Sequence, residues 1–115
     1  MSNTTISEIL NGRDWVLADG ATGTNYFSVG LQSGDSPELW NIDHPERVAT
    51  LHREFIDAGS DIILTNSFGG TSCRLKLHGS EDRVRELNRA AAFIARNEAD
   101  RAKKNIVVAA SIGPT

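Results

Sequence analysis

Residues 52–71 read HREFIDAGSDIILTNSFGGT, and this stretch decides the fold. Its first part completes a helix that starts at Pro45 and presents one apolar face, formed by Val48, Leu51, His52, Phe55 and Ile56. Gly59 ends that helix, and the consecutive β-branched and apolar residues of Asp61–Asn66 predict a strand covered on both sides. A helix that leads directly into a buried strand is typical of parallel α/β folds.

The flanking sequence repeats this alternation of strand and helix. The apolar run Trp15–Ala18 predicts a first strand, and Asn105–Ser111 predicts a third. Ser80 is expected to cap a long helix, whose apolar face is formed by Val84, Leu87, Ala91, Ile94 and Ala95. Shorter helical segments are expected at Thr5–Leu10, from Ser36 through Trp40, and around Cys73 and Leu75.

The order of these elements predicts the fold class. Strand, helix, strand, helix, strand requires parallel strands joined by right-handed crossovers, with both helices on one side of the sheet, so the class is α/β. The chain ends directly after its third strand, where a parallel sheet still has an open edge. Because a (β/α)8 TIM barrel takes about 250 residues, we expect residues 1–115 to be its first three β/α units, the N-terminal part of an incomplete barrel domain.

Composition excludes several classes of protein. The 115 residues carry 12 basic and 15 acidic side chains, a net charge of -3, which does not favour binding to nucleic acid. Cys73 is alone, so no intramolecular disulfide can form and a reducing compartment is expected. No apolar run approaches the roughly 20 residues of a membrane span, and the N-terminus lacks a signal peptide. We therefore predict a cytoplasmic protein without membrane association.

The first strand opens into a glycine-rich loop, Asp19–Thr24, of sequence DGATGT. If its glycines adopt positive φ, the amides around Gly20, Ala21 and Thr22 can converge on an anion such as a carboxylate. Asp19 beside them could then hold the ammonium group of an amino acid. An equally compatible interpretation is a tight turn in which Asp19 accepts hydrogen bonds from nearby backbone N–H groups.

Phosphate binding is the alternative function for the same loop. A P-loop needs a lysine directly after its last glycine, whereas Gly23 is followed by Thr24. The phosphate turn of sugar-kinase-like folds is a looser match and requires a β-hairpin after the loop. A small-molecule or phosphate-binding α/β module therefore stays as the alternative hypothesis, and a non-catalytic fragment that packs against a partner is a third.

The other two strand ends also carry polar residues. Asn66 and Ser67 could hydrogen-bond a ligand, but on the residues alone a capped turn into the next helix is favoured. Ser111 is open to the same two interpretations, and no base is placed to make it a nucleophile. His52 is interpreted as a hydrogen-bonded packing residue and Cys73 as a packing thiol, so no residue is predicted to bind metal.

Three motifs together resemble the start of the homocysteine S-methyltransferase family. They are LADGATGT at residues 17–24, the stretch at 52–71, and SIGP at residues 111–114. The resemblance runs from about Trp15 to Thr115. The family includes betaine-homocysteine methyltransferase and the homocysteine-binding domain of cobalamin-dependent methionine synthase. It implies a (β/α)8 barrel that transfers a methyl group to the thiol of homocysteine to form methionine.

The resemblance also implies roles for individual residues. Asp19 would meet the ammonium group of homocysteine, and nearby backbone amides would meet its carboxylate. Asn66 and Ser67 would lie at the barrel mouth, near the substrate. The predicted substrate-binding residues are thus Asp19, Gly20, Ala21, Thr22, Asn66 and Ser67.

Zinc and the methyl donor are implied only for the full-length protein. In the family three cysteines on late strands hold zinc, and their motifs do not occur in residues 1–115. Cys73 is not assigned as a ligand, so this segment alone is expected to be inactive. The donor is betaine, S-methylmethionine or a methylated corrinoid or folate system, and the Asp35–Asn41 segment could approach it, although Trp40 is equally suited to packing. A homo-oligomer is a possible state of the full-length protein.

Overall fold

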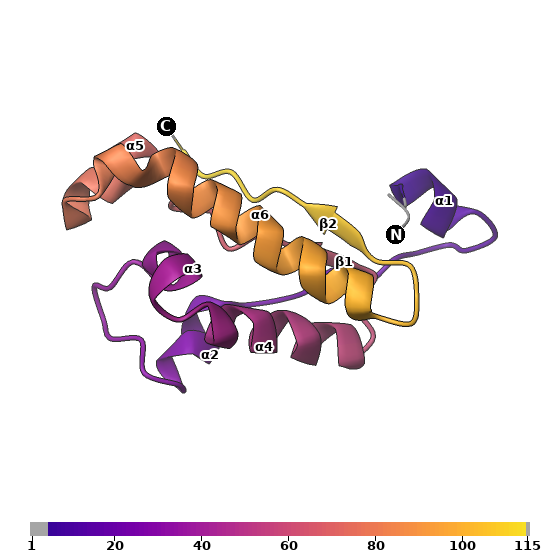
Figure 1. Ribbon diagram of the computed structural model, residues 1–115. Helices are drawn as coiled ribbons and strands as arrows, with labels where there is room; N and C mark the ends of the chain where they lie inside the picture. Colours follow the sequence, from indigo (N-terminus) through magenta and orange to yellow (C-terminus); the bar gives the residue numbers. More distant parts are fainter. Residues whose placement is uncertain (1–4, 115) are drawn as a thin grey trace.

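The structure, a computed structural model, describes residues 5–114. Its centre is a sheet of two short parallel strands, β1 (Ile62–Leu64) and β2 (Val107–Ala109), which pair in the register Ile63↔Val108 (Figure 1). The parallel pairing follows from the helix that connects them. This part of the α/β prediction is confirmed, although each strand is shorter than the apolar run that predicts it.

The predicted first strand is present only as an isolated bridge. Ala18 pairs with Ile62 in parallel, and the Asp19 N–H donates to the Ile62 carbonyl at 2.9 Å. The amides of Asp61 and Ile62 both donate to the same Leu17 carbonyl. The regular hydrogen-bond pattern of a parallel strand pair therefore does not continue toward Trp15. Trp15, expected inside this strand, is 64% exposed. The expected three β/α units are thus seen as two strands and one bridged segment.

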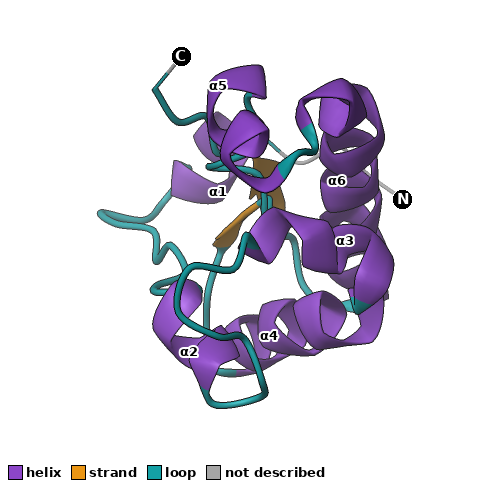
Figure 2. Cartoon of the chain, turned by 90° about the vertical axis from the view of Figure 1, so that its left-hand side faces the viewer, coloured by secondary structure: helices purple, strands orange, loops and turns teal. Residues whose placement is uncertain are grey.

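Two long helices lie on one side of the sheet. Helix α4 (Pro45–Asp57) packs against β1, and helix α6 (Val84–Arg101) packs against β2 and α4 (Figures 1 and 2). This arrangement follows the predicted crossover geometry. The other side is open, because Ile63 is fully buried while Leu64 is 38% exposed. The expectation that this strand is covered on both sides is therefore wrong within the described residues.

Helix α6 begins later than predicted. A 3-10 turn, η3 (Glu81–Arg83), precedes its first residue, Val84. The Ser80 hydroxyl donates to the His78 carbonyl and makes no cap hydrogen bond. The expected Ser80 cap is therefore wrong, because the preceding turn uses that side chain.

Shorter elements connect these helices and strands. Thr5 and Glu8 form a capping box at the start of α1 (Ile6–Leu10), where a short helix is expected. The segment after Ser36 is longer than expected and continues into a second helix. The remaining elements are α1 (Ile6–Leu10), α2 (Gly23–Phe27), η1 (Pro37–Leu39), α3 (Trp40–Asp43), α5 (Ser72–Leu75) and η2 (Lys76–His78).

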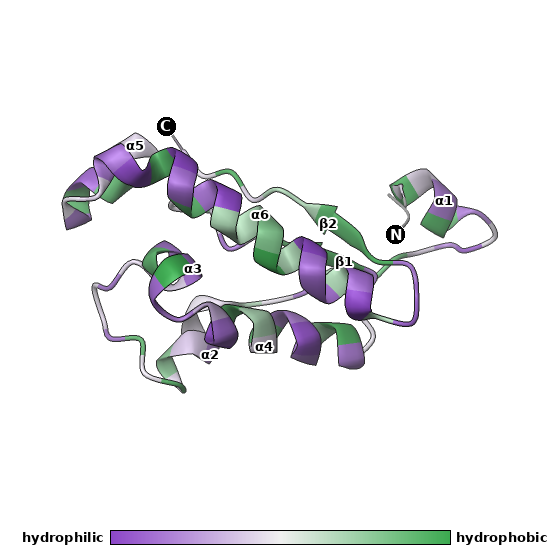
Figure 3. Cartoon of the chain, in the orientation of Figure 1, coloured by the Kyte–Doolittle hydropathy of each residue, from purple (hydrophilic) through white to green (hydrophobic). Residues whose placement is uncertain are grey.

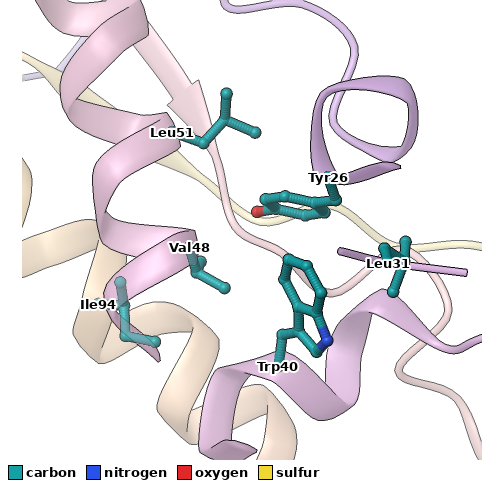
Figure 4. Close-up of a cluster of buried hydrophobic side chains, with 6 residues drawn as sticks. All are labelled: Tyr26, Leu31, Trp40, Val48, Leu51 and Ile94. Atoms are coloured by element: carbon teal, nitrogen blue, oxygen red, sulfur yellow. The ribbon is translucent and has the colours of Figure 1, made fainter. Parts of the chain in front are cut away.

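The core consists of two clusters of buried side chains. One joins α2, α3, α4 and α6 and contains Tyr26, Leu31, Trp40, Val48, Leu51 and Ile94 (Figure 4). The second lies between the sheet and the long helices and contains Ile56, Ile63, Ala95, Ala99 and Ile106. Figure 3 shows hydrophobic strands beside helices with mixed surfaces. No helix within residues 5–114 combines the length and apolar character needed to cross a bilayer.

His52 is a packing residue, but its ring is not satisfied as expected. It is 2% exposed on the face of α4 that meets α6. Its Nε2 atom has no hydrogen-bond partner among the described residues. The prediction of a buried packing role is confirmed, whereas a hydrogen-bonded ring is wrong for this nitrogen.

Candidate functional site

A single pocket brings together all the residues predicted to bind substrate. It has a volume of about 240 Å³ and lies where the bridged segment, β1 and β2 reach their carboxyl ends. Ligands of parallel α/β folds bind at this end of the strands. The lining residues are Asp19, Gly20, Ala21, Thr22, Glu38, Leu64, Thr65, Asn66, Ser67, Phe68 and Ser111.

Asp19 divides its two carboxylate oxygens between structure and pocket. Oδ2 accepts a hydrogen bond from the Leu64 N–H at 3.0 Å, which fixes the side chain to β1. Oδ1 is buried and has no partner among the described residues. Burial raises the pKa of Asp19, and backbone hydrogen bonds oppose that shift. The side chain thus has an unused acceptor on a pocket wall.

The glycine loop differs from the predicted anion nest. Neither Gly20 nor Gly23 has a positive φ, so the conformation assumed for converging amides is wrong at these positions. Instead, Gly23 begins α2, and the Tyr26 N–H donates to the Thr22 carbonyl at 2.8 Å. A helix after the loop also excludes the β-hairpin required by the sugar-kinase-like phosphate turn. The part of the pocket wall formed by Asp19–Thr22 therefore leads directly into the short helix α2.

Asn66 and Ser67 line the pocket but use their polar atoms internally. The Asn66 side-chain amide donates to the Pro37 carbonyl and to Asn41 Oδ1, both at 2.9 Å. The Ser67 hydroxyl is within hydrogen-bond distance of Thr65 Oγ1 and of the Ser111 carbonyl. These bonds agree with the capped-turn interpretation. They tie β1 to η1, α3 and the segment after β2.

Glu38 lines the pocket and Asn41 supports Asn66, and the sequence prediction assigned a role to neither residue individually. Asn41 returns a hydrogen bond to the Asn66 carbonyl and also donates to Leu87 in α6. Glu38 is 6% exposed and lines the pocket from η1. Both lie in a segment interpreted only as a helix start that could approach a methyl donor. Polar residues are common near the start of a helix, so the sequence alone did not indicate that Glu38 and Asn41 are buried.

Tyr26 belongs to the core cluster that joins α2 to α4 and has a buried hydroxyl. Its ring packs on Trp40, with ring centroids 5.2 Å apart, and its hydroxyl has no partner among the described residues (Figure 4). Burial, together with the charges of Glu38 and Asp19, raises the pKa of Tyr26. The hydroxyl therefore stays protonated near these two carboxylates. The Trp40 side chain is 7% exposed, which identifies it as a packing residue.

A second pocket adjoins the first. It also has a volume of about 240 Å³, and it shares Thr22, Glu38 and Phe68 with the first pocket. Its other walls include the carboxylate of Asp35, the guanidinium of Arg74 and the imidazole of His78. Two small compartments with a common wall could hold two reactants side by side.

The described residues do not form a zinc site. Within residues 5–114, no group of three His, Cys, Asp or Glu side chains is placed to hold a metal ion. Cys73 is exposed on α5 and is the chain's single cysteine. Structural and catalytic zinc sites need at least three protein ligands. Residues 5–114 therefore do not fit the zinc that the family resemblance implies.

Comparison with known proteins identifies relatives of this chain. The family model for homocysteine S-methyltransferase matches residues 16–115. Methionine synthase of Mycobacterium tuberculosis is 33% identical over 104 residues, which cover 85% of this chain and 9% of that protein. Methionine synthase of Mycobacterium leprae is also 33% identical, over 74% of this chain and 8% of that protein.

Solved structures give the same result. The metallated form of the homocysteine methyltransferase MmuM from Escherichia coli superposes with a TM-score of 0.79 at 25% identity. The match covers 92% of this chain and 40% of that chain, so this chain spans less than half of its structural neighbour. The match of the family model to nearly all of the sequence agrees with the three motifs. The chain belongs to the homocysteine S-methyltransferase family.

Proposed function

We propose that the full-length protein transfers a methyl group to the thiol of homocysteine to form methionine, and that this segment binds the amino-acid end of the substrate. Family membership supports the reaction. The observation that carries the binding role is the unused Asp19 Oδ1 in a pocket that contains every predicted substrate-binding residue. An ammonium group would supply the hydrogen bond and the positive charge that this carboxylate lacks.

The size and charge of the pocket fit a small amino acid. At about 240 Å³ it is smaller than the pockets of roughly 300–1,000 Å³ that hold drug-sized ligands. Asp19 takes the ammonium group, and, as the family resemblance implies, backbone amides of Gly20, Ala21 and Thr22 take the carboxylate, without the positive-φ nest expected from the sequence. In this arrangement Asn66 and Ser67 act as supports of the wall, because their side chains are bonded to the protein.

The second pocket is the proposed place of the methyl donor. Its common wall with the first pocket would put a donor beside the homocysteine thiol. Betaine, S-methylmethionine and methylated corrinoid or folate systems are all candidates. The proposed zinc dependence would need ligands outside the described residues, and inactivity of residues 1–115 in isolation is proposed for the same reason.

Calorimetry of the full-length protein with homocysteine tests the binding role of Asp19. We expect Asp19→Asn to weaken binding at least tenfold, about 1.4 kcal/mol, because it removes the charge. Asparagine can still accept from the Leu64 N–H, so the fold is kept. Asp82→Asn is the matched control, since Asp82 is exposed and lies outside the substrate pocket. Equal affinity for the wild type and Asp19→Asn would show that Asp19 does not bind the substrate.

The same calorimetry distinguishes homocysteine binding from the alternative function, phosphate binding. A phosphate-binding module should bind ATP and show no heat with homocysteine. The substrate pocket has no Lys or Arg among its lining residues, which favours the amino-acid substrate. Metal analysis of the full-length protein tests the proposed zinc, and gel filtration tests the proposed homo-oligomer.

A further inference from the structure

Glu38 makes two hydrogen bonds from a buried position between the two pockets. Its Oε2 accepts from the Gly69 N–H at 2.9 Å, and its Oε1 accepts from the Ser36 hydroxyl at 2.9 Å. These bonds connect η1 to the loop that follows β1. Glu38 has no salt bridge within residues 5–114, so its buried carboxylate is held by neutral donors. Such burial is costly unless the geometry is well satisfied.

The loop is shaped to accept this carboxylate. A Cβ atom at Gly69 would lie 2.8 Å from Glu38 Oε1, closer than real Cβ contacts allow. A methyl group at this position would require the Glu38 carboxylate to move away from the Gly69 N–H. On the other side of the loop, a Cβ at Gly113 would overlap the Phe68 carbonyl oxygen. The Phe68–Gly69 segment is therefore held between η1 and the segment after β2.

The segment held in this way is the wall that both pockets share. Phe68 lines each pocket, and its side chain is 53% exposed, so packing alone does not fix the ring. Its backbone position depends on the neighbouring Gly69 bond to Glu38. Small displacements of groups that orient a substrate reduce binding and turnover.

We infer that Glu38 is a positioning residue that fixes the Phe68–Gly69 wall between the two pockets and thereby sets the affinity of the first pocket for its amino acid. This inference rests on the proposed function. Glu38 acts through Gly69 and Phe68, whereas Asp19 is proposed to touch the substrate. The hydrogen-bonding geometry of the side chain, and not its charge, is what the role requires.

Variants of Glu38 in the full-length protein separate geometry from charge. Glutamine can accept from the Gly69 N–H and donate to the Ser36 hydroxyl, so Glu38→Gln keeps both links. We expect Glu38→Gln to bind homocysteine within about threefold of wild type, and Glu38→Ala to bind about tenfold more weakly. Glu81→Ala, at an exposed position in η3, is the control. Circular dichroism confirms that each variant is folded at the temperature of the calorimetry.

A double-mutant cycle tests the link to the loop. Gly69→Ala introduces the methyl group that displaces Glu38, so it should weaken binding as Glu38→Ala does. In the Glu38→Ala background the methyl group meets no carboxylate, so Gly69→Ala should have little further effect. Gly69→Ala also provides the test if Glu38→Ala does not fold. The inference is supported if the losses of homocysteine affinity in Glu38→Ala and Gly69→Ala are not additive and Glu38→Gln keeps near wild-type affinity.

The opposite outcomes overturn it. Wild-type affinity in Glu38→Ala, additive losses in the cycle, or equal losses in Glu38→Gln and Glu38→Ala would each exclude a positioning role through Gly69. Asp19→Asn is measured in parallel. If Asp19→Asn weakens binding and the Glu38 and Gly69 variants do not, only this inference fails. If the wild type does not bind homocysteine, the proposed function fails.

Discussion

At the scale of single residues, buried polar atoms show what the sequence pattern could not. His52 lies at a helical spacing that predicts burial, and it is buried. The same spacing contains no information on whether a partner reaches its ring, because partners come from other elements. Asp19 is similar: its position after an apolar run predicts a pocket residue, but its bond to the Leu64 N–H depends on the parallel pairing. Spacing predicts position better than it predicts bonding.

The unsatisfied ring of His52 makes the protein less stable in acid. Burial lowers the pKa of His52 from 6.5 to about 4, and the nearby charge of Glu98 opposes this only in part. The folded state therefore keeps the ring neutral, and the unfolded chain binds a proton first as the pH falls below 6.5. Stability is complete above that pH and is lost between pH 6.5 and about 4.

Urea unfolding at two pH values measures this effect. We expect the wild type to lose about 2 kcal/mol more than His52→Leu between pH 7 and pH 5. Leucine keeps the apolar packing and has no proton to bind. Parallel pH profiles for the two proteins would show that His52 is protonated equally in the folded and unfolded states.

At the scale of elements, apolar periodicity predicted the long helices and failed at the short ones. The buried faces of α4 and α6 are those expected from their sequences, except that Phe55 and Val84 are only partly buried. Helix α2 begins within the predicted glycine-rich loop Asp19–Thr24, although Gly23 and Thr24 are weak helix formers. Packing of Tyr26 on Trp40 stabilises it, which is a tertiary effect. The apolar run Trp15–Ala18 predicts a first strand, but whether a strand forms depends on its backbone pairing with β1, and only Ala18 pairs there.

The bridged segment is anchored to β1 by a charged cluster at Asp61. Arg13 donates to both oxygens of the Asp61 carboxylate, at 3.2 and 2.9 Å, and the Leu17 N–H donates to Oδ2 at 3.0 Å. Hydrogen bonding to Arg13 lowers the pKa of Asp61. Asp61→Ala would leave a backbone donor and a guanidinium without their acceptor.

We expect Asp61→Ala to lower the melting temperature by on the order of 5 °C. Limited proteolysis should also cut residues 10–18 faster, because this segment loses its anchor. Asp100→Ala is the matched control, since Asp100 pairs with Arg96 at i,i+4 on the partly exposed surface of α6, where such pairs contribute little. A loss no larger than that of the control would show that Asp61 does not anchor the segment.

At the scale of the whole molecule, one side of the sheet has no covering layer among the described residues. Large apolar side chains are exposed there and at the neighbouring strand ends: Leu17, Leu64, Phe68 and Ile112 are 45%, 38%, 53% and 78% exposed. The molecule is elongated, with extents of 46 × 27 × 23 Å. In the family structure that it resembles, this chain accounts for 40% of the length. The sequence predicts the α/β class. It does not predict that this side of the sheet is exposed, because exposure depends on which other parts of a protein pack against it.

An open apolar face predicts self-association of residues 1–115 in isolation. Contiguous exposed apolar surface is removed from water when molecules meet, and an open parallel edge can pair with another chain. We expect this segment to elute in gel filtration ahead of its 12.5 kDa monomer, increasingly so at higher concentration. Leu64→Ser with Ile112→Ser should shift elution toward the monomer, whereas Phe93→Ser, on the exposed surface of α6, should not. A wild-type segment that stays monomeric at high concentration would show that this face does not drive association.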